Sequence, residues 1–178
     1  MNRNEIRIAG AGGQGVVTAG RILAEAAILS GSHATHSQVY GPQSRGGASR
    51  SDVVIATGPI GFPLADDIDL LIVLSAEAYT RYQPELSPDG RLIVDGRCAP
   101  ASLAGTARQF AVVDTSRAIS GSQLVTGVVA LGVLQAVADV VEDEALRTAV
   151  AARVPAKHRD MNLKALEAGA HLVRETSP

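Results

Sequence analysis

The stretch that decides the fold reads Ile6-Arg7-Ile8-Ala9-Gly10-Ala11-Gly12-Gly13-Gln14-Gly15. Residues 6–9 are mostly apolar and predict a short buried strand. The apolar residues of the segment 16–29 recur at helical spacing, so a helix is expected to follow. The glycines therefore occupy a strand-to-helix turn, and three of them match the G-x-G-x-x-G pattern of phosphate-binding turns: Gly10, Gly12 and Gly15. Glycine allows a ligand to approach closely, and the helix that follows directs N–H groups and a partial positive charge at it.

This pattern alone does not identify a ligand. A dinucleotide site also requires an acidic residue about 20 positions further on, where it holds the ribose hydroxyls. Residues 30–37 contain neither aspartate nor glutamate, which argues against NAD or FAD. Two interpretations stay open. The glycines only allow the strand and the helix to pack closely, or the turn binds another anion or makes a contact that exists only in a complex.

A second glycine-rich stretch reads Tyr40-Gly41-Pro42-Gln43-Ser44-Arg45-Gly46-Gly47-Ala48-Ser49-Arg50. Its three glycines and one proline predict a loop without regular structure. The loop carries two arginines and no acid, which favours binding of a phosphate or a carboxylate, because arginine offers a fork of donors and glycine exposes backbone N–H groups. The alternative is a solvated loop with two surface arginines.

The rest of the chain alternates strands and helices up to about residue 120, which predicts an α/β fold. We expect strands at 33–39, 52–57, 69–74, 91–95 and 109–113, helices at 76–83 and 99–106, and turns at 58–63 and 87–90. Three further helices are expected at 124–141, 142–154 and 160–175. The predicted fold is a single domain over residues 1–178, a three-layer α/β/α structure with an open, mostly parallel sheet and a helical C-terminal third.

The expected helix 124–141 is apolar nearly all round, so it should be buried, either inside the domain or against a partner. Gly127 and Gly132 would let another element approach it closely.

Composition limits the possible functions further. The net charge of −2 provides no field that would attract nucleic acid, and no stretch resembles a signal peptide or a membrane span. Cys98 is the only cysteine, so no intrachain disulfide, Cys-ligated iron–sulfur cluster or structural zinc site is expected. No nucleophile elbow or Walker loop is present. We therefore expect a cytoplasmic protein that binds neither nucleic acid nor membranes, with no catalytic residue and no metal site of its own.

The two glycine-rich motifs together resemble the gamma subunit, or gamma domain, of 2-oxoacid:ferredoxin oxidoreductases, the family that acts on pyruvate, 2-oxoglutarate or 2-ketoisovalerate. The resemblance extends over essentially the whole chain and rests on residues 6–17 and 38–47, with weaker support from 52–55, 59–63, Asn162 and Gly169. The chain departs from the family pattern at residues 122–125, where an asparagine is expected before the long apolar helix.

The resemblance implies a division of labour. Such complexes oxidatively decarboxylate a 2-oxoacid with coenzyme A, giving an acyl-CoA, CO2 and reduced ferredoxin. Thiamine diphosphate and its Mg2+ would lie on companion alpha and beta subunits, and iron–sulfur clusters on the beta subunit or on a ferredoxin-like delta subunit. This chain would carry no cofactor alone. Because the subunit is short and separate, 2-oxoglutarate is favoured over pyruvate, branched-chain 2-oxoacids and indolepyruvate.

The resemblance also implies that the two motifs line the coenzyme A side of the complex or hold a partner subunit. The candidate site residues are Gly10, Gly12, Gly13, Gln14, Gly15, Tyr40, Gly41, Pro42, Arg45, Gly46, Gly47 and Ser49. Two competing functions are a stand-alone nucleotide- or anion-binding module and a pure assembly subunit that uses the apolar 124–141 helix as an interface.

Overall fold

The computed structural model describes residues 3–39, 47–100 and 107–176. The elements follow in the order β1 (Arg3–Ala11), α1 (Val16–Leu29), β2 (His33–Val39), β3 (Ala48–Ala56), β4 (Ile68–Val73), α2 (Ala76–Tyr82), η1 (Gln83–Glu85), β5 (Leu86–Asp95), β6 (Arg108–Phe110), α3 (Val112–Ser120), α4 (Thr126–Ala138), α5 (Asp143–Arg153), η2 (Ala156–His158) and α6 (Arg159–Thr176).

One open sheet forms the middle layer, with the strand order β2-β3-β1-β4-β5-β6. Strands β1, β4, β5 and β6 pair in parallel, whereas β3 pairs antiparallel with both β1 and β2. Among the described strands, β3 therefore runs against the others. The expected open, mostly parallel sheet is confirmed, with one reversed strand that makes it mixed.

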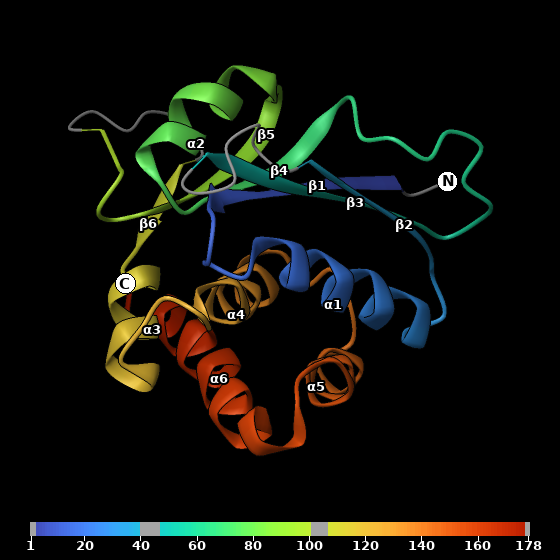
Figure 1. Cartoon of the computed structure of the whole chain (residues 1–178). Helices are drawn as coiled ribbons and strands as arrows, with labels where there is room; N and C mark the ends of the chain where they lie inside the picture. The colour runs from blue at the N-terminus through green and yellow to red at the C-terminus, as the bar shows by residue number, and fades with distance from the viewer. Residues whose placement is uncertain (1–2, 40–46, 101–106, 177–178) are drawn as a thin grey trace.

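The two faces of the sheet are covered unequally (Figure 1). Helices α1, α3, α4, α5 and α6 lie on one face, whereas α2 and η1 cover the other. Strand β4 is apolar and buried at every residue except Asp69, because it has layers on both sides. The larger core lies between the sheet and α1, α4, α5 and α6, and a smaller one lies under α2 around Leu71, Val73 and Tyr82.

Helix α4 is buried by its own domain. Every residue from Thr126 to Gln135 is buried. The helix crosses α6 so closely that a Cβ added to Gly132 would overlap the Leu166 carbonyl oxygen. The expected close approach at Gly132 is confirmed, and α6 is one of the elements that cover this helix.

Four local predictions were wrong or inexact. The expected loop 40–50 ends earlier than predicted, because Ala48–Arg50 pair with β1 and start β3. The expected turn 87–90 is part of β5, whose register with β4 is irregular between Ile68 and Leu70. The expected strand 109–113 ends at Phe110. Helix α4 is shorter than predicted, because residues 124–125 precede it and residues 139–141 follow it.

The reason for the helix at Val112 is a buried capping contact. The Asp95 carboxylate, at the end of β5, accepts the Val113 N–H at 2.8 Å, so it satisfies a donor in the first turn of α3. Of the helix expected at 99–106, residues 101–106 lie outside the described residues, and Ala99 and Pro100 are not helical.

Candidate functional site

The glycine turn connects the end of β1 to the start of α1. Gly13 and Gly15 adopt left-handed conformations, with φ of 87° and 73°, which glycine reaches without strain. The Gln14 N–H donates to the Ala11 carbonyl at 3.3 Å and closes the turn. The N-cap residue, Gly15, has no side chain with which to cap α1, so the first N–H groups of the helix receive no bond from a capping residue.

Gln14 lies inside the turn. It is only 4 % exposed, and its amide bonds three separate segments. Its Oε1 accepts the Ala11 N–H at 2.7 Å, and its Nε2 donates to the Leu74 carbonyl at 2.9 Å and to Gln123 Oε1 at 3.1 Å. These bonds account for both amide protons, so in this arrangement Gln14 supports the turn from within.

Two glycines of the motif allow close packing. A Cβ at Gly10 would overlap Gln14 Oε1 and would stand 3.0 Å from Leu74 Cβ. A Cβ at Gly15 would stand 3.0 Å from the Leu124 carbonyl oxygen. Across the same contact, a Cβ at Gly127 would stand 2.6 Å from the Gly15 carbonyl oxygen. The packing interpretation therefore holds for Gly10 and Gly15, and the expected close approach at Gly127 is confirmed.

The other two glycines, Gly12 and Gly13, are exposed, and a Cβ added to Gly13 would meet open space. They border a hollow of about 340 Å³. It is lined by Ala11, Gly12, Gly13, Gly15, Val16, Val17, Thr18, Ser49 and Leu124. The hollow lies at the carboxyl end of β1 and at the N-terminus of α1, a place where open α/β sheets bind ligands and where the helix favours negative charge.

Of the seven predicted site residues that the structure describes, four line this hollow: Gly12, Gly13, Gly15 and Ser49. Ser49 reaches it because its strand pairs it with Gly10. The other three described residues do not line it: Gly47 lies two residues before Ser49, and Gly10 and Gln14 are buried. Tyr40, Gly41, Pro42, Arg45 and Gly46 lie outside the described residues.

Sequence reasoning missed the wall opposite the glycines. Leu124 lines the hollow with a side chain that is 70 % exposed, in the segment that leads into α4. The sequence does not predict this, because a leucine at the start of an apolar stretch is expected to be buried in the core. Thr18 was missed as well, although it follows from helical geometry, because it lies in the first turn after the glycines.

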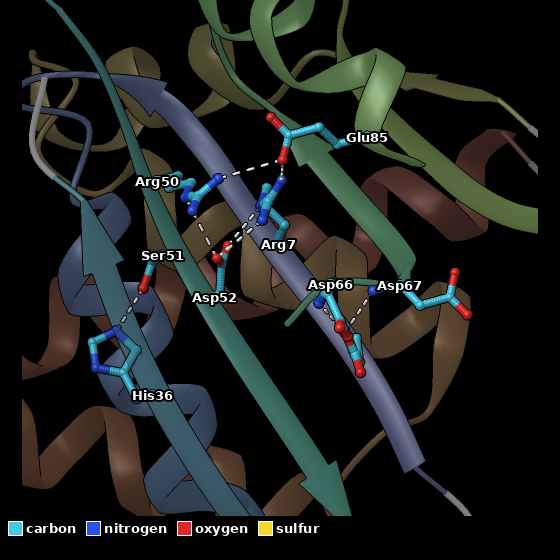
Figure 2. A network of polar contacts seen from close by, with 9 residues as sticks. Arg7, His36, Arg50, Ser51, Asp52, Asp66, Asp67 and Glu85 are labelled. Atoms are coloured by element: carbon cyan, nitrogen blue, oxygen red, sulfur yellow. Dashed lines mark hydrogen bonds and ion pairs between the residues drawn. The ribbon is translucent and has the colours of Figure 1, made fainter. Parts of the chain in front are cut away.

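The arginine next to this site is engaged by carboxylates. Figure 2 shows Arg50 and Arg7 sharing Asp52 and Glu85. Arg7 is only 1 % exposed and holds Asp52 with two bonds, from Nε at 2.7 Å and from Nη2 at 3.1 Å. The guanidinium groups of Arg7 and Arg50 also lie 5.4 and 5.6 Å from the centre of the Tyr82 ring. Arg50 therefore belongs to a structural ion network.

Further polar groups are also used structurally. Burial raises the pKa of Asp95, whose carboxylate accepts backbone N–H groups of Arg97 and Val113. Burial also raises the pKa of the Cys98 thiol to about 11, which keeps it protonated at neutral pH. His36 bonds Ser51 Oγ at 2.6 Å (Figure 2), and burial lowers its pKa.

In residues 3–39, 47–100 and 107–176, no group of three or more His, Cys, Asp or Glu side chains could hold a metal ion. No helix in these same ranges is long and apolar enough to cross a membrane.

Comparison with known proteins identifies the class. Residues 5–172 match the family described as pyruvate ferredoxin/flavodoxin oxidoreductase, and the chain belongs to this family. Within it, the chain is homologous to the KorC subunit of 2-oxoglutarate synthase from Methanothermobacter thermautotrophicus, with 37 % identity over 98 % of this chain and 97 % of the relative.

Solved structures agree with this assignment. The gamma subunit of a keto/oxoacid ferredoxin oxidoreductase from Geobacter sulfurreducens is 38 % identical, with both chains fully covered and a TM-score of 0.87. A 2-oxoglutarate:ferredoxin oxidoreductase from Magnetococcus marinus, solved with 2-oxoglutarate, coenzyme A and succinyl-CoA, has the same fold in part of a longer chain. There the TM-score is 0.88 and the identity 20 %, over 99 % of this chain and 32 % of that one.

Proposed function

We propose that this chain is the gamma subunit of a 2-oxoglutarate:ferredoxin oxidoreductase and that its hollow binds an anionic part of coenzyme A. Alpha and beta subunits, with or without a delta subunit, would carry thiamine diphosphate, Mg2+ and the iron–sulfur clusters, and ferredoxin would accept the electrons. The full-length similarity to a KorC subunit supports the substrate and the assembly. The observation that supports the coenzyme A role is the hollow at the N-terminus of α1.

The residues that line the hollow fit a phosphate group. The exposed backbone of Gly12 and Gly13 allows close approach, and the first turn of α1 offers N–H groups that its N-cap residue, Gly15, does not bond because glycine has no side chain. Ser49 adds a hydroxyl, and Leu124 adds an apolar surface suited to an uncharged part of the ligand. Bound there, coenzyme A would supply the thiol that accepts the acyl group.

This chain would bind and orient coenzyme A without taking part in bond making. Among the described residues, the one thiol, Cys98, is held protonated by burial, and Asp95 is committed to backbone N–H groups. We therefore assign this subunit a binding and positioning role, with the chemistry on its companions. The burial of α4 inside the domain removes the apolar interface on which the assembly-only alternative was based.

The test is a charge placed at the mouth of the hollow. Thr18 is exposed in the first turn of α1, where glutamate is favourable for the helix. Thr18→Glu should therefore leave the fold intact but repel a phosphate, raising the Kd and KM for coenzyme A about tenfold, the equivalent of about 1.4 kcal/mol. The readouts are calorimetric binding and 2-oxoglutarate-dependent dye reduction by the anaerobically assembled complex.

The matched control is Thr148→Glu, the same change at an exposed position of α5 that does not line the hollow. It should leave both constants unchanged. Arg45→Ala is a second test, chosen from the sequence motif alone, and it should raise the KM for coenzyme A to the same extent. An unchanged coenzyme A affinity in Thr18→Glu would refute the proposed role of the hollow. A complex that reduces dye with another 2-oxoacid but not with 2-oxoglutarate would refute the substrate assignment.

A further inference from the structure

We infer that Gln14 is a positioning residue, which holds the two walls of the hollow at a fixed separation. One wall is the exposed backbone of Gly12 and Gly13. The other is Leu124, which lies in the lead segment, residues 123–127, where the chain enters and begins α4. The inference rests on the proposed function, because it concerns how the same hollow is kept in shape for an anionic ligand.

The hydrogen bonds of Gln14 reach three separate parts of the chain. Its Oε1 is bonded within the turn, to the Ala11 N–H at 2.7 Å, whereas its Nε2 bonds Leu74 at the end of β4 and Gln123 in the lead segment. Its backbone carbonyl also accepts the Gly127 N–H at 2.8 Å. One residue therefore connects the glycine turn, the central strand β4 and the start of α4.

The segments that these bonds join are closely packed. The turn and the lead segment touch through backbone atoms, since a Cβ at Gly127 would stand 2.6 Å from the Gly15 carbonyl oxygen. Gly10 leaves space for the Gln14 amide, because a Cβ there would overlap Oε1. Close-packed backbone transmits a local change instead of absorbing it.

Leu124 makes this connection relevant to the ligand. It lines the hollow from the lead segment, one residue after the partner of Gln14. A change at Gln14 would therefore move Leu124 relative to Gly12 and Gly13 without altering any group that lines the hollow. Small displacements of ligand-positioning groups lower affinity and rate strongly.

The decisive variant is Gln14→Glu. It keeps the size of the side chain and the oxygen that accepts the Ala11 N–H, but it replaces the amide that donates to Leu74 and Gln123 with a carboxylate oxygen, which cannot donate. In the assembled complex, we expect the calorimetric Kd and the KM for coenzyme A to rise at least about fivefold, the factor for one lost hydrogen bond. The KM for 2-oxoglutarate should stay unchanged, because the hollow is assigned to coenzyme A alone.

The matched control is Gln135→Glu. Gln135 is also a buried glutamine, and its Nε2 donates to Asp139, Val141 and Asp143 at the far end of α4. It should lower thermal stability without changing the affinity for coenzyme A. Gln123→Ala is a milder second variant, because it removes a single partner of Gln14 and keeps a measurement available if Gln14→Glu does not assemble. It should raise the Kd in the same direction.

The outcomes separate this inference from the proposed function. If Thr18→Glu weakens coenzyme A binding but Gln14→Glu and Gln123→Ala do not, the positioning role is refuted and the hollow is still the site. If Gln135→Glu weakens binding as much as Gln14→Glu, the effect is general loss of stability and the inference is again refuted. If Thr18→Glu does not change the affinity for coenzyme A, the proposed site and the inference are both refuted.

Discussion

The crossing of α4 and α6 allows a sharp prediction about stability. Gly132 and Gly169 face each other across this crossing. A Cβ at Gly132 would overlap the Leu166 carbonyl oxygen and would stand 2.9 Å from Ala170 N, whereas a Cβ at Gly169 would stand 3.0 Å from Val133 N. All these neighbours are backbone atoms of a helix, so no side chain can rotate away. Gly132→Ala therefore forces the two helices apart.

The magnitude follows from two opposing effects. In a helix interior, alanine is better than glycine by about 1 kcal/mol. Against this, α6 must retreat from 2.9 Å to about 3.5 Å at Ala170 N, and further at the Leu166 carbonyl. Overpacking a well-filled core costs about 1–3 kcal/mol, and rigid backbone on both sides places this site at the upper end or beyond. We expect a net loss of about 2 kcal/mol in the free energy of unfolding.

The assay is urea unfolding of the purified chain, supported by thermal melting. A loss of about 2 kcal/mol corresponds to a fall in Tm of about 4–8 °C for a chain of this size. Ala136→Gly is the calibrating variant, since Ala136 is exposed on the same helix and should lose about 1 kcal/mol through helix propensity alone. If Gly132→Ala is as stable as the unmodified chain, or more stable, the helices are not in the tight contact described.

Two further predictions concern buried groups. Arg7→Met should lower the free energy of unfolding by about 3 kcal/mol, because it leaves the buried Asp52 with only the more distant Arg50. Urea unfolding measures this loss. A loss below about 1 kcal/mol would show that these charges are well hydrated. In the folded chain, the alkylation rate of Cys98 should keep rising with pH up to about 11, because burial holds its pKa near that value and only the thiolate reacts. A plateau near pH 9 in the folded chain would contradict this assignment, and the urea-unfolded chain supplies the reference.

Segments with a strong local signal were predictable from the sequence. Helix α1 occupies residues 16–29, as its apolar spacing indicated, because Gly15 starts it and the Ser30-Gly31 pair ends it. Ser75, the residue before the predicted helix 76–83, caps α2, and its side chain accepts the Ala78 N–H at 3.3 Å. In these places the residues next to each other in sequence decide the conformation.

Where distant contacts decide the conformation, local signals failed. Proline and glycine at residues 88–90 indicate a turn, yet this segment continues β5, because Leu86 pairs with Ile68 across the sheet. Val112 and Val113 favour a strand locally, yet the carboxylate of Asp95 caps a helix there.

The candidate site shows the same division. The glycine turn was recognisable because its spacing is local. Its second wall was not, because Gln123 is 109 positions from Gln14 and only the folded chain brings the two amides together. The loop around Arg45 lies outside the described residues, so its role is still a prediction from the sequence motif.

The outer strands of the sheet bear on how the protein behaves at high concentration. An exposed sheet edge can recruit a strand from another molecule and start aggregation, especially when it is long and apolar. Here one outer strand, β2, reads His-Ala-Thr-His-Ser-Gln-Val and is mostly polar, and the other, β6, is only three residues long. Both edges therefore make poor templates for a neighbouring strand. A chain that must stay dissolved until it meets its companions benefits from such edges.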